Sequence, residues 1–271
     1  MKHIRYGLLV FMIISFSFGR SIVDNHLALL VVIGMLSSFI GTLAGGGGLI
    51  TVPAMMLTGI PIQTSIATNK FSSGIAAMSS VFYLVNRRQL TIQAIVKTVA
   101  TAFVGGIAGA LLTAYISEKT MNVVAFVLLF FALIVTVGSK NWAKGRKGEE
   151  VTLSPQSWRP WTPLFIAAYD GGFGPGSSTF GILYYMKKHH TYLKAVQLTR
   201  VLILGSCVGG FLVFYQTGFF QWPYAVALAI GSTVGSQVGL LVLPKVPMKL
   251  AKGLLLTVTC LLILSIVYKL V

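Results

Sequence analysis

The sequence contains the same pattern of residues twice, with the second copy 130 positions after the first. At this offset, and without a gap, glycines align with glycines and cations with cations: Gly41 with Gly171, Gly46 with Gly176, Lys70 with Arg200, Gly105 with Gly235, Gly109 with Gly239 and Lys119 with Lys249. Leucines and valines would coincide between any two apolar segments, whereas these residue types would not. A duplicated membrane unit with a glycine-rich break and a cation in each copy is typical of secondary transporters.

The composition places both copies in a membrane. Hydrophobic residues make up 55% of the 271 residues and charged residues only 10%, whereas soluble domains carry roughly 25% charged residues. A helix needs about 20 apolar residues to cross the hydrocarbon core, and stretches of about that length recur along the chain. The predicted fold class is therefore all-α, a polytopic helical membrane protein. The net charge of +16 fits Lys and Arg retained in cytoplasmic loops, and does not indicate nucleic-acid binding.

The apolar segments divide the chain into two repeats and two further parts. They cover residues 6–19, 27–59, 64–86, 90–116, 120–138, 161–186, 193–217, 220–243 and 249–269. We expect an N-terminal transmembrane helix (1–26), a first membrane repeat (27–139), a cytoplasmic linker (140–159) and a second membrane repeat (160–271). Segment 6–19 has a basic start and an apolar core, so a cleaved signal peptide is the alternative to an uncleaved first helix. The GxxxG pairs at 105–109 and 235–239 are expected to be packing features.

The charges between the segments predict that the second repeat is inserted upside down. Lys and Arg are in excess at the N-terminus and near residues 87–88, 140–160, 187–194 and 245–252, whereas the connections 20–26, 60–63, 117–119 and 217–221 are neutral. With basic loops in the cytoplasm, segments 27–59 and 161–186 must each return to the side from which they enter.

Both returning segments contain a run that interrupts a regular helix, at 45–48 and at 171–176. Each repeat then has one glycine-broken re-entrant segment plus three transmembrane helices, an odd number of crossings. The sequence therefore predicts inverted-topology repeats, with the N-terminus in the cytoplasm and the C-terminus outside the cell.

Lys70 and Arg200 lie at equivalent positions inside apolar segments. A charge at the centre of a membrane helix costs at least ~2.5–3.5 kcal/mol, so it is a functional-site hypothesis by default. The alternative is that each side chain extends to the membrane surface. Two cations at equivalent positions of oppositely inserted copies favour the functional interpretation, because the symmetry carries both toward one central region.

The residues around these cations predict a binding site for a small oxyanion. A helix that begins after a glycine turn presents free N–H groups and the positive end of its dipole. Hydroxyl and amide side chains lie beside the turns and the cations. The predicted substrate-binding residues are Lys70, Arg200, Asn69, Thr199, Gly46, Gly47, Gly174, Gly176 and Ser177.

Asp170 is the sole acidic residue within an apolar segment, since the other four Asp and Glu residues fall in loops. Three roles for it remain open at this point. It can form an ion pair with Arg200, act as a protonatable group that couples transport to a proton gradient, or cap the turn ahead of Gly171.

The sequence contains none of the common catalytic or nucleotide-binding motifs. HExxH, GxSxG and GxxxxGK[ST] are absent, and no two acids lie close enough for acid–base catalysis. We therefore expect a protein that is not an enzyme, with no cofactor and no metal site. The expected partners are a small anionic substrate and the lipid bilayer, with no nucleic acid, and a homo-oligomer remains open.

Two motifs resemble those of the TauE/SafE-type sulfite and organosulfur exporter family. The first copy has Gly41-Thr-Leu-Ala-Gly-Gly-Gly-Gly-Leu-Ile-Thr-Val-Pro53, followed by Ile66-Ala-Thr-Asn-Lys70-Phe-Ser-Ser73. The second copy has Gly171-Gly-Phe-Gly-Pro-Gly176, followed by Ala195-Val-Gln-Leu-Thr-Arg200. The resemblance covers the chain from about residue 27 onward, and it departs at Ser177-Ser178, where a further glycine is often found.

This resemblance implies a multi-pass permease in the inner membrane of a bacterium that moves sulfite, sulfonates or related anions. It also implies that the anion site lies at Lys70, Arg200 and the glycine turns. The leading prediction is a secondary transporter for a small sulfur-containing oxyanion or a carboxylate, working by alternating access. An anion channel would use the same residues but needs a continuous pore. A membrane-embedded enzyme or assembly factor is the third class, and the missing catalytic motifs argue against it.

Overall fold

The structure is a computed structural model that describes residues 26–88, 90, 92–138, 161–188, 190–247, 250, 253, 256, 257 and 260. All regular structure in these residues is helical, which confirms the predicted all-α fold class. The predicted helix 6–19, the linker 140–159 and most of the apolar segment 249–269 lie outside the described residues.

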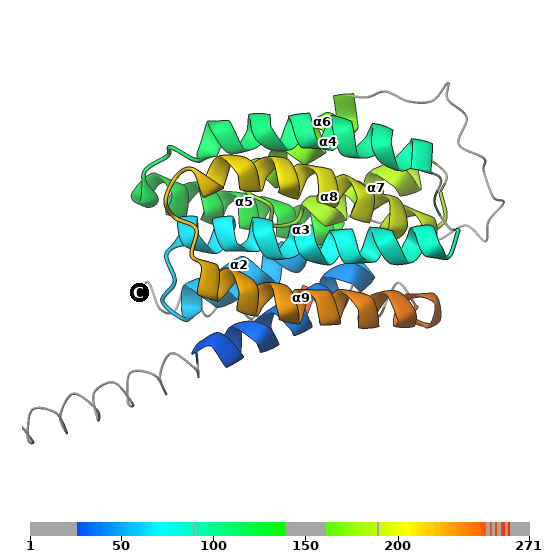
Figure 1. The fold of residues 1–271 in the computed structure, drawn as a ribbon, viewed down its shortest axis with the longest axis horizontal. Coiled ribbons are helices and arrows are strands. Elements are labelled where there is room, and N and C mark those ends of the chain that lie inside the picture. The colour runs from blue at the N-terminus through cyan, green and yellow to red at the C-terminus, as the bar shows by residue number, and fades with distance from the viewer. Residues whose placement is uncertain are drawn as a thin grey trace, which may run out of the picture.

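The helices lie roughly along one direction, as Figure 1 shows. Their bounds are His26–Ala44, α2 Gly47–Leu57, α3 Ile62–Asn86, α4 Ile92–Thr113, α5 Glu118–Gly138, α6 Trp161–Gly172, α7 Ser177–Lys187, α8 Tyr192–Tyr215, α9 Trp222–Val242 and the short 3₁₀ helix η3 Leu243–Lys245. Helices α3 and α8 pack against each other; α4 packs on α8 and α6, and α9 packs on α3.

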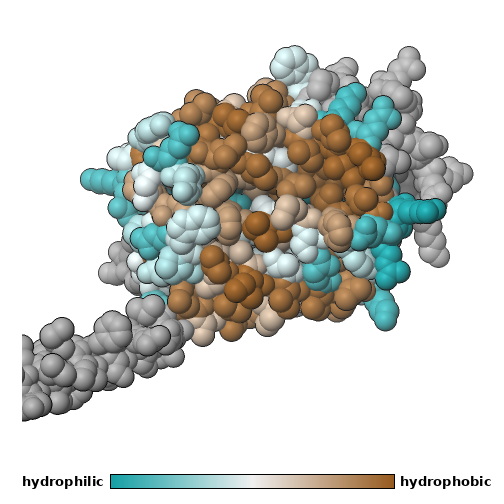
Figure 2. All heavy atoms as spheres, viewed as in Figure 1, coloured by the Kyte–Doolittle hydropathy of each residue, from teal (hydrophilic) through white to brown (hydrophobic). Residues whose placement is uncertain are grey.

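Four of the described helices are long and apolar enough to cross a membrane: His26–Ala44, Ile95–Thr113, Tyr192–Tyr215 and Trp222–Lys245. Figure 2 shows apolar side chains across the middle of the molecule and hydrophilic side chains gathered toward its two ends. Large apolar side chains such as Phe82 (68% exposed) and Leu112 (78% exposed) lie on the outer surface. Exposed apolar surface on this scale is expected where lipid, not water, is the solvent.

Helix α3 has 25 residues but carries many polar side chains. It follows Pro61 and ends at Asn86, two residues before Arg88, which has a φ of 54°. Most of its polar residues are nevertheless buried, because α8 and α9 cover it. The buried polar residues of α3 are Gln63, Thr64, Ser65, Thr68, Asn69, Lys70, Ser72 and Ser80. Buried polar groups need partners inside the protein, so the interior of this fold is polar along α3.

Glycines hold the two copies together through close backbone contacts. A Cβ atom at Gly109 of α4 would overlap the backbone of Ala168 in α6, and one at Gly235 of α9 would overlap the backbone of Met35 in the helix His26–Ala44. Small residues allow helix backbones to approach this closely. The third apolar segment of each copy thus packs on the first segment of the other copy, and the GxxxG pairs are packing features, as predicted.

Helices α3 and α8, which align at the 130-residue offset, meet in antiparallel orientation. Gly74 of α3 faces Cys207 of α8. About one turn later in α3, Ala77 clusters with Ile203, which lies about one turn earlier in α8. Contacts that advance along one helix while they retreat along the other require the two helices to run in opposite directions.

Candidate functional site

Two helices begin in the interior of the fold, directly after the two glycine turns. Gly46 precedes α2 with a φ of 75°, and Gly176 precedes α7 with a φ of 85°. Glycine adopts this left-handed conformation without the steric cost of a Cβ atom. Backbone carbonyl groups accept from the first-turn N–H groups of Leu49, Ser177 and Thr179. Neither Gly46 nor Gly176 has a side chain that could cap the remaining first-turn N–H groups of α2 and α7. A helix therefore begins directly after each of the two glycine turns.

The two glycine turns lie against each other. A Cβ atom at Gly45 would lie 2.8 Å from the backbone nitrogen of Thr179, and one at Gly48 would lie 3.2 Å from the Cα atom of Pro175. Both contacts join the start of one half-helix to the turn before the other. The positive dipole ends of α2 and α7 therefore converge on one region.

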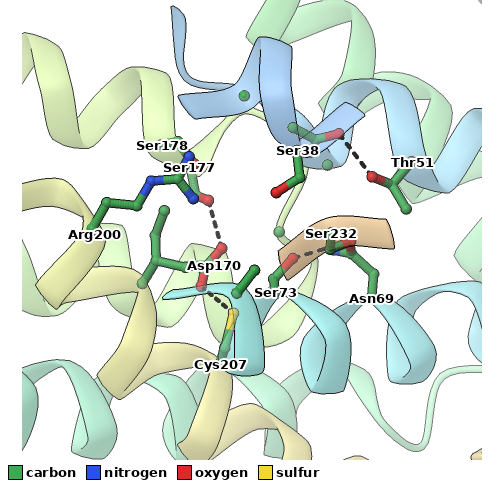
Figure 3. A pocket seen from close by; sticks show the side chains of 16 residues that line it. Ser38, Thr51, Asn69, Ser73, Asp170, Ser177, Ser178, Arg200, Cys207 and Ser232 are labelled. Atoms are coloured by element: carbon green, nitrogen blue, oxygen red, sulfur yellow. Dashed lines mark hydrogen bonds between the residues drawn. The ribbon is translucent and has the colours of Figure 1, made fainter. Parts of the chain in front are cut away.

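A pocket opens at this point of convergence (Figure 3). Apart from Arg200, Asp170, Asn69 and Cys207, its walls consist of glycines, small hydroxyl residues, one alanine and one isoleucine. The lining residues are Ser38, Gly41, Gly47, Gly48, Thr51, Asn69, Ser73, Ala76, Asp170, Gly174, Ser177, Ser178, Arg200, Ile203, Cys207 and Ser232. They come from both copies of the repeat, so the pocket belongs to the interface between the copies.

Arg200 places its positive charge in this pocket. The side chain projects from α8 and is only 8% exposed. Its Nη2 atom donates a hydrogen bond to the hydroxyl of Thr42, which in turn donates to the carbonyl oxygen of Ser38 at 2.7 Å. Figure 3 shows the guanidinium group beside Ser177 and Ser178. Because a guanidinium group has five N–H donors, most of its donors remain available to a bound molecule.

Lys70 has different partners, although it occupies the equivalent position in the first copy. Its side chain is fully buried, and its Nζ atom donates a hydrogen bond to the backbone carbonyl oxygen of Asp170. The same Nζ lies 3.7 Å from the Oδ1 atom of Asp170. The ion pair of Asp170 is therefore with Lys70, not with Arg200 as one sequence interpretation allowed.

The carboxylate of Asp170 is surrounded by donors. Ser177 donates to its Oδ1 atom at 2.5 Å, while Ser206 and Cys207 donate to its Oδ2 atom, the thiol at 3.4 Å. The carboxylate thus connects α6, α7 and α8, and the ammonium group of Lys70 adds α3. Ser206 and Cys207 follow Arg200 in α8, and the sequence offers no sign of their role beyond this proximity.

The structure separates the predicted site residues into two groups. Arg200, Asn69, Gly47, Gly174, Ser177 and Asp170 line the pocket, whereas Lys70, Thr199, Gly46 and Gly176 are not among its lining residues. The hydroxyl of Thr199 donates to the carbonyl oxygen of Ala195 at 2.7 Å. Gly46 and Gly176 set the turns instead. The sequence missed Ser38 and Ser232, because a serine in an apolar helix does not reveal which face it occupies.

The charges of the site do not cancel. Among the described residues, Lys70 and Asp170 form the recorded ion pair, and no carboxylate lies within 4 Å of the Arg200 guanidinium. The described part of the chain also holds no group of His, Cys, Asp and Glu residues suited to a metal ion. One positive charge therefore remains in a buried, hydroxyl-lined pocket, next to two helix N-termini. This arrangement favours binding of a small anion.

The comparisons with known proteins agree with this geometry. Residues 30–266 match the family described as sulfite exporter TauE/SafE. A probable membrane transporter protein of Sinorhizobium, ORF9, is 30% identical over 215 residues, which cover 79% of this chain and 81% of that protein. A probable membrane transporter protein of Haemophilus influenzae is 30% identical over 217 residues, covering 79% and 83%.

A third relative, the probable membrane transporter protein YfcA of Escherichia coli, is 28% identical over 219 residues, which cover 79% of each chain. No solved structure matches this chain. The family match extends over residues 30–266, a range that includes both glycine turns, Lys70 and Arg200. This chain belongs to the TauE/SafE sulfite exporter family.

Proposed function

We propose that this protein is a secondary transporter that moves a small anion across the membrane by alternating access, with sulfite, sulfonates or related organosulfur anions as substrates. The observation that carries the proposal is Arg200, a buried cation without an acidic partner among the described residues, in a pocket between two helix N-termini. Membership of the family and the names of its relatives as probable membrane transporters support it.

The proposed transport mechanism uses two inverted repeats. Three observations support the inversion: α3 and α8 meet in antiparallel orientation, the long helices pack across the two copies, and the glycine turns touch each other. The contact between Gly45 and Ser178 becomes the contact between Pro175 and Gly48 when each residue is shifted by the 130-residue offset. Helix α2 has only 11 residues, about 16 Å in length, which fits a re-entrant segment.

The proposed location is the inner membrane of a bacterium. The helix ends that adjoin basic loops would face the cytoplasm. Arg87, Lys187 and Lys245 all lie at helix ends, and the loops near 60, 117 and 217 are neutral. The N-terminus would lie in the cytoplasm and the C-terminus outside. Asp170 stays the predicted candidate for a proton-coupling group.

An anion channel and a membrane-embedded enzyme or assembly factor are the competing functions. A channel needs a continuous pore, and countertransport-stimulated, saturable flux would exclude it. An enzyme needs a catalytic arrangement, and turnover of a lipid or peptide in detergent without transport would favour it. The charge of the pocket favours an anion over a cationic substrate in each case.

The function is tested with purified protein in two steps. The first step is a thermal-shift screen against sulfite, thiosulfate, sulfate, sulfoacetate and simple carboxylates. Anions of the substrate class should raise the melting temperature of the protein, because a ligand that binds only the native state stabilises it. Proteoliposomes should then show saturable flux of that anion, stimulated by the same anion on the opposite side. No stabilisation by any anion and no flux would contradict the proposal.

The pocket must be closed on one side at a time, and the two sides carry different residues at equivalent positions. Near the neutral loops, Phe71 lies 5.2 Å from Phe211 and 5.5 Å from Phe220 between ring centroids. Tyr215 and Trp222 extend the same cluster. At the 130-residue offset the equivalents of these five aromatic residues are aliphatic. In the order Phe71, Phe211, Tyr215, Phe220 and Trp222, they are Val201, Val81, Val85, Leu90 and Ile92. The aromatic cluster would close the pocket on one side of the membrane and the aliphatic residues would close it on the other. Because the two sets of contacts differ, one could open while the other stays closed.

We expect Phe220→Ala to loosen the aromatic seal and expose the pocket from outside. In a Cys260→Ser background, Cys207 is the sole thiol, and it lines the pocket while being almost fully buried. A membrane-impermeant thiol reagent added outside should label Cys207 several-fold faster in Phe220→Ala than in the parent. Phe82→Ala, which removes an exposed ring elsewhere, is the matched control. Equal labelling of both variants would rule out a seal at Phe220.

A further inference from the structure

A lysine side chain binds the C-terminal end of α6. The last four carbonyl groups of a helix lack intrahelical partners, and this end of the helix carries a partial negative charge. In α6, Tyr169 accepts from the backbone nitrogens of Phe173 and Gly174, and Gly172 accepts from the hydroxyl of Thr113 at 2.9 Å. The carbonyl of Asp170 accepts from the ammonium group of Lys70.

The side chain of Asp170 adds a full negative charge to the same place. Its Oδ1 atom lies 3.7 Å from the Lys70 ammonium nitrogen, and it accepts from Ser177 at 2.5 Å. The ammonium nitrogen also lies tightly against Gly174, where a Cβ atom would be 2.6 Å from it. A helix C-terminus, a carboxylate and no solvent exposure together form a site for one monovalent cation. The chain fills this site with its own ammonium group.

The equivalent helix of the first copy, His26–Ala44, has no such site. The residue 130 positions before Asp170 is Ile40, so Arg200, the counterpart of Lys70, has no acid at the equivalent place. Arg200 donates instead to the neutral hydroxyl of Thr42. The two equivalent cations therefore differ in their surroundings, since Asp170 neutralises the charge of Lys70 and no acid neutralises that of Arg200 among the described residues.

We propose that Lys70 is a tethered cation, which fills a cation site made by Asp170 and the C-terminal end of α6, and that the transported anion binds Arg200 without contacting Lys70. This inference rests on the proposed function for its substrate. Transporters with broken helices use unwound carbonyl groups and half-helix C-terminal ends to hold a coupling cation such as Na⁺. Here the ammonium group occupies that position, so transport needs no Na⁺. Lys70 is a positioning residue that fixes the second glycine turn.

The inference is tested by comparing single and double charge removal. Lys70→Met leaves the carboxylate of Asp170 unpaired in the pocket wall, which repels an anion and should weaken sulfite binding about tenfold or more. Lys70→Met/Asp170→Asn removes both charges and should recover most of the sulfite binding that Lys70→Met loses, because the net charge near Arg200 is restored. A double variant that loses binding as the single variant does would make Lys70 a direct ligand and overturn the inference.

The melting temperature provides a readout that does not depend on the anion. Removing one partner of a buried ion pair is strongly destabilising, whereas removing both is often tolerated. Lys70→Met should therefore lower the melting temperature, or prevent accumulation, and the added Asp170→Asn change should restore it. A double variant as unstable as the single one contradicts the tethered-cation role even if the protein transports no sulfite. Absence of sulfite binding in the parent, with this rescue intact, would instead contradict the proposed function.

An external cation should replace the missing ammonium group. In Lys70→Ala proteoliposomes, ethylammonium should stimulate flux of sulfite, whereas in Lys70→Ala/Asp170→Asn it should have no effect because the carboxylate is gone. Parent protein should transport equally well in Na⁺-containing and Na⁺-free buffers. A strict requirement of the parent for Na⁺, or ethylammonium stimulation in the double variant, would contradict the assignment.

Discussion

Arg200→Gln is expected to abolish binding and flux of the transported anion while the protein remains folded. The glutamine keeps an amide donor but removes the positive charge that faces the pocket. Truncating one partner of a buried, hydrogen-bonded charge pair costs about 2–5 kcal/mol, which corresponds to roughly a 30-fold to several-thousand-fold loss of affinity. The measurement is anion-dependent thermal stabilisation in detergent, followed by flux in proteoliposomes.

The control for this experiment removes the same charge elsewhere. Lys245→Gln at the exposed end of η3 leaves the pocket untouched and should bind and transport as the parent does. Arg200→Lys should retain part of the affinity, because a point charge replaces the guanidinium fork. Unchanged flux in Arg200→Gln would remove Arg200 from the anion site.

Gly109→Ala and Gly235→Ala should destabilise the fold itself. At both positions the added Cβ atom would overlap the backbone of the helix packed against it, in α6 and in the helix His26–Ala44 respectively. A backbone cannot move aside as a flexible side chain can, so each change should cost about 1–3 kcal/mol or more. The melting temperature and the monodispersity of the purified protein in detergent report the loss.

Gly74→Ala is the matched control for these two changes. This glycine also lies in a long helix between the copies, but a Cβ atom there would be 3.6 Å from Cys207, an ordinary contact. We expect a melting temperature close to that of the parent. If the three variants were equally stable, the close packing of α4 on α6 and of α9 on the helix His26–Ala44 would not contribute to stability.

The sequence predicted the features that a repeat and its glycines can encode. The breaks at Gly46 and Gly176, the half-helices after them and the burial of both cations follow from local chemistry and the 130-residue offset. The family was also predictable from the two motifs, because glycine turns and cations at fixed spacing are specific, whereas apolar composition is not.

The different roles of Lys70 and Arg200 could not be predicted from their equivalence. They align with each other, but their partners come from segments far away in the sequence, and Asp170 aligns with Ile40. Thr42 was missed for the same reason, since the hydrogen bonds of its hydroxyl with Arg200 of α8 and Ser236 of α9 join segments far apart in the sequence. A repeat therefore predicts which positions matter, while the differences between its copies decide what each position does.

The most direct test of the anion site is anomalous X-ray scattering from selenite, the selenium analogue of sulfite, bound to crystals of the protein. Our account predicts a selenium peak in the pocket, between the Arg200 guanidinium and the N-termini of α2 and α7, which disappears in Arg200→Gln crystals. A selenium peak at the Lys70 ammonium group, or peaks on the protein surface alone with the pocket vacant, would contradict it.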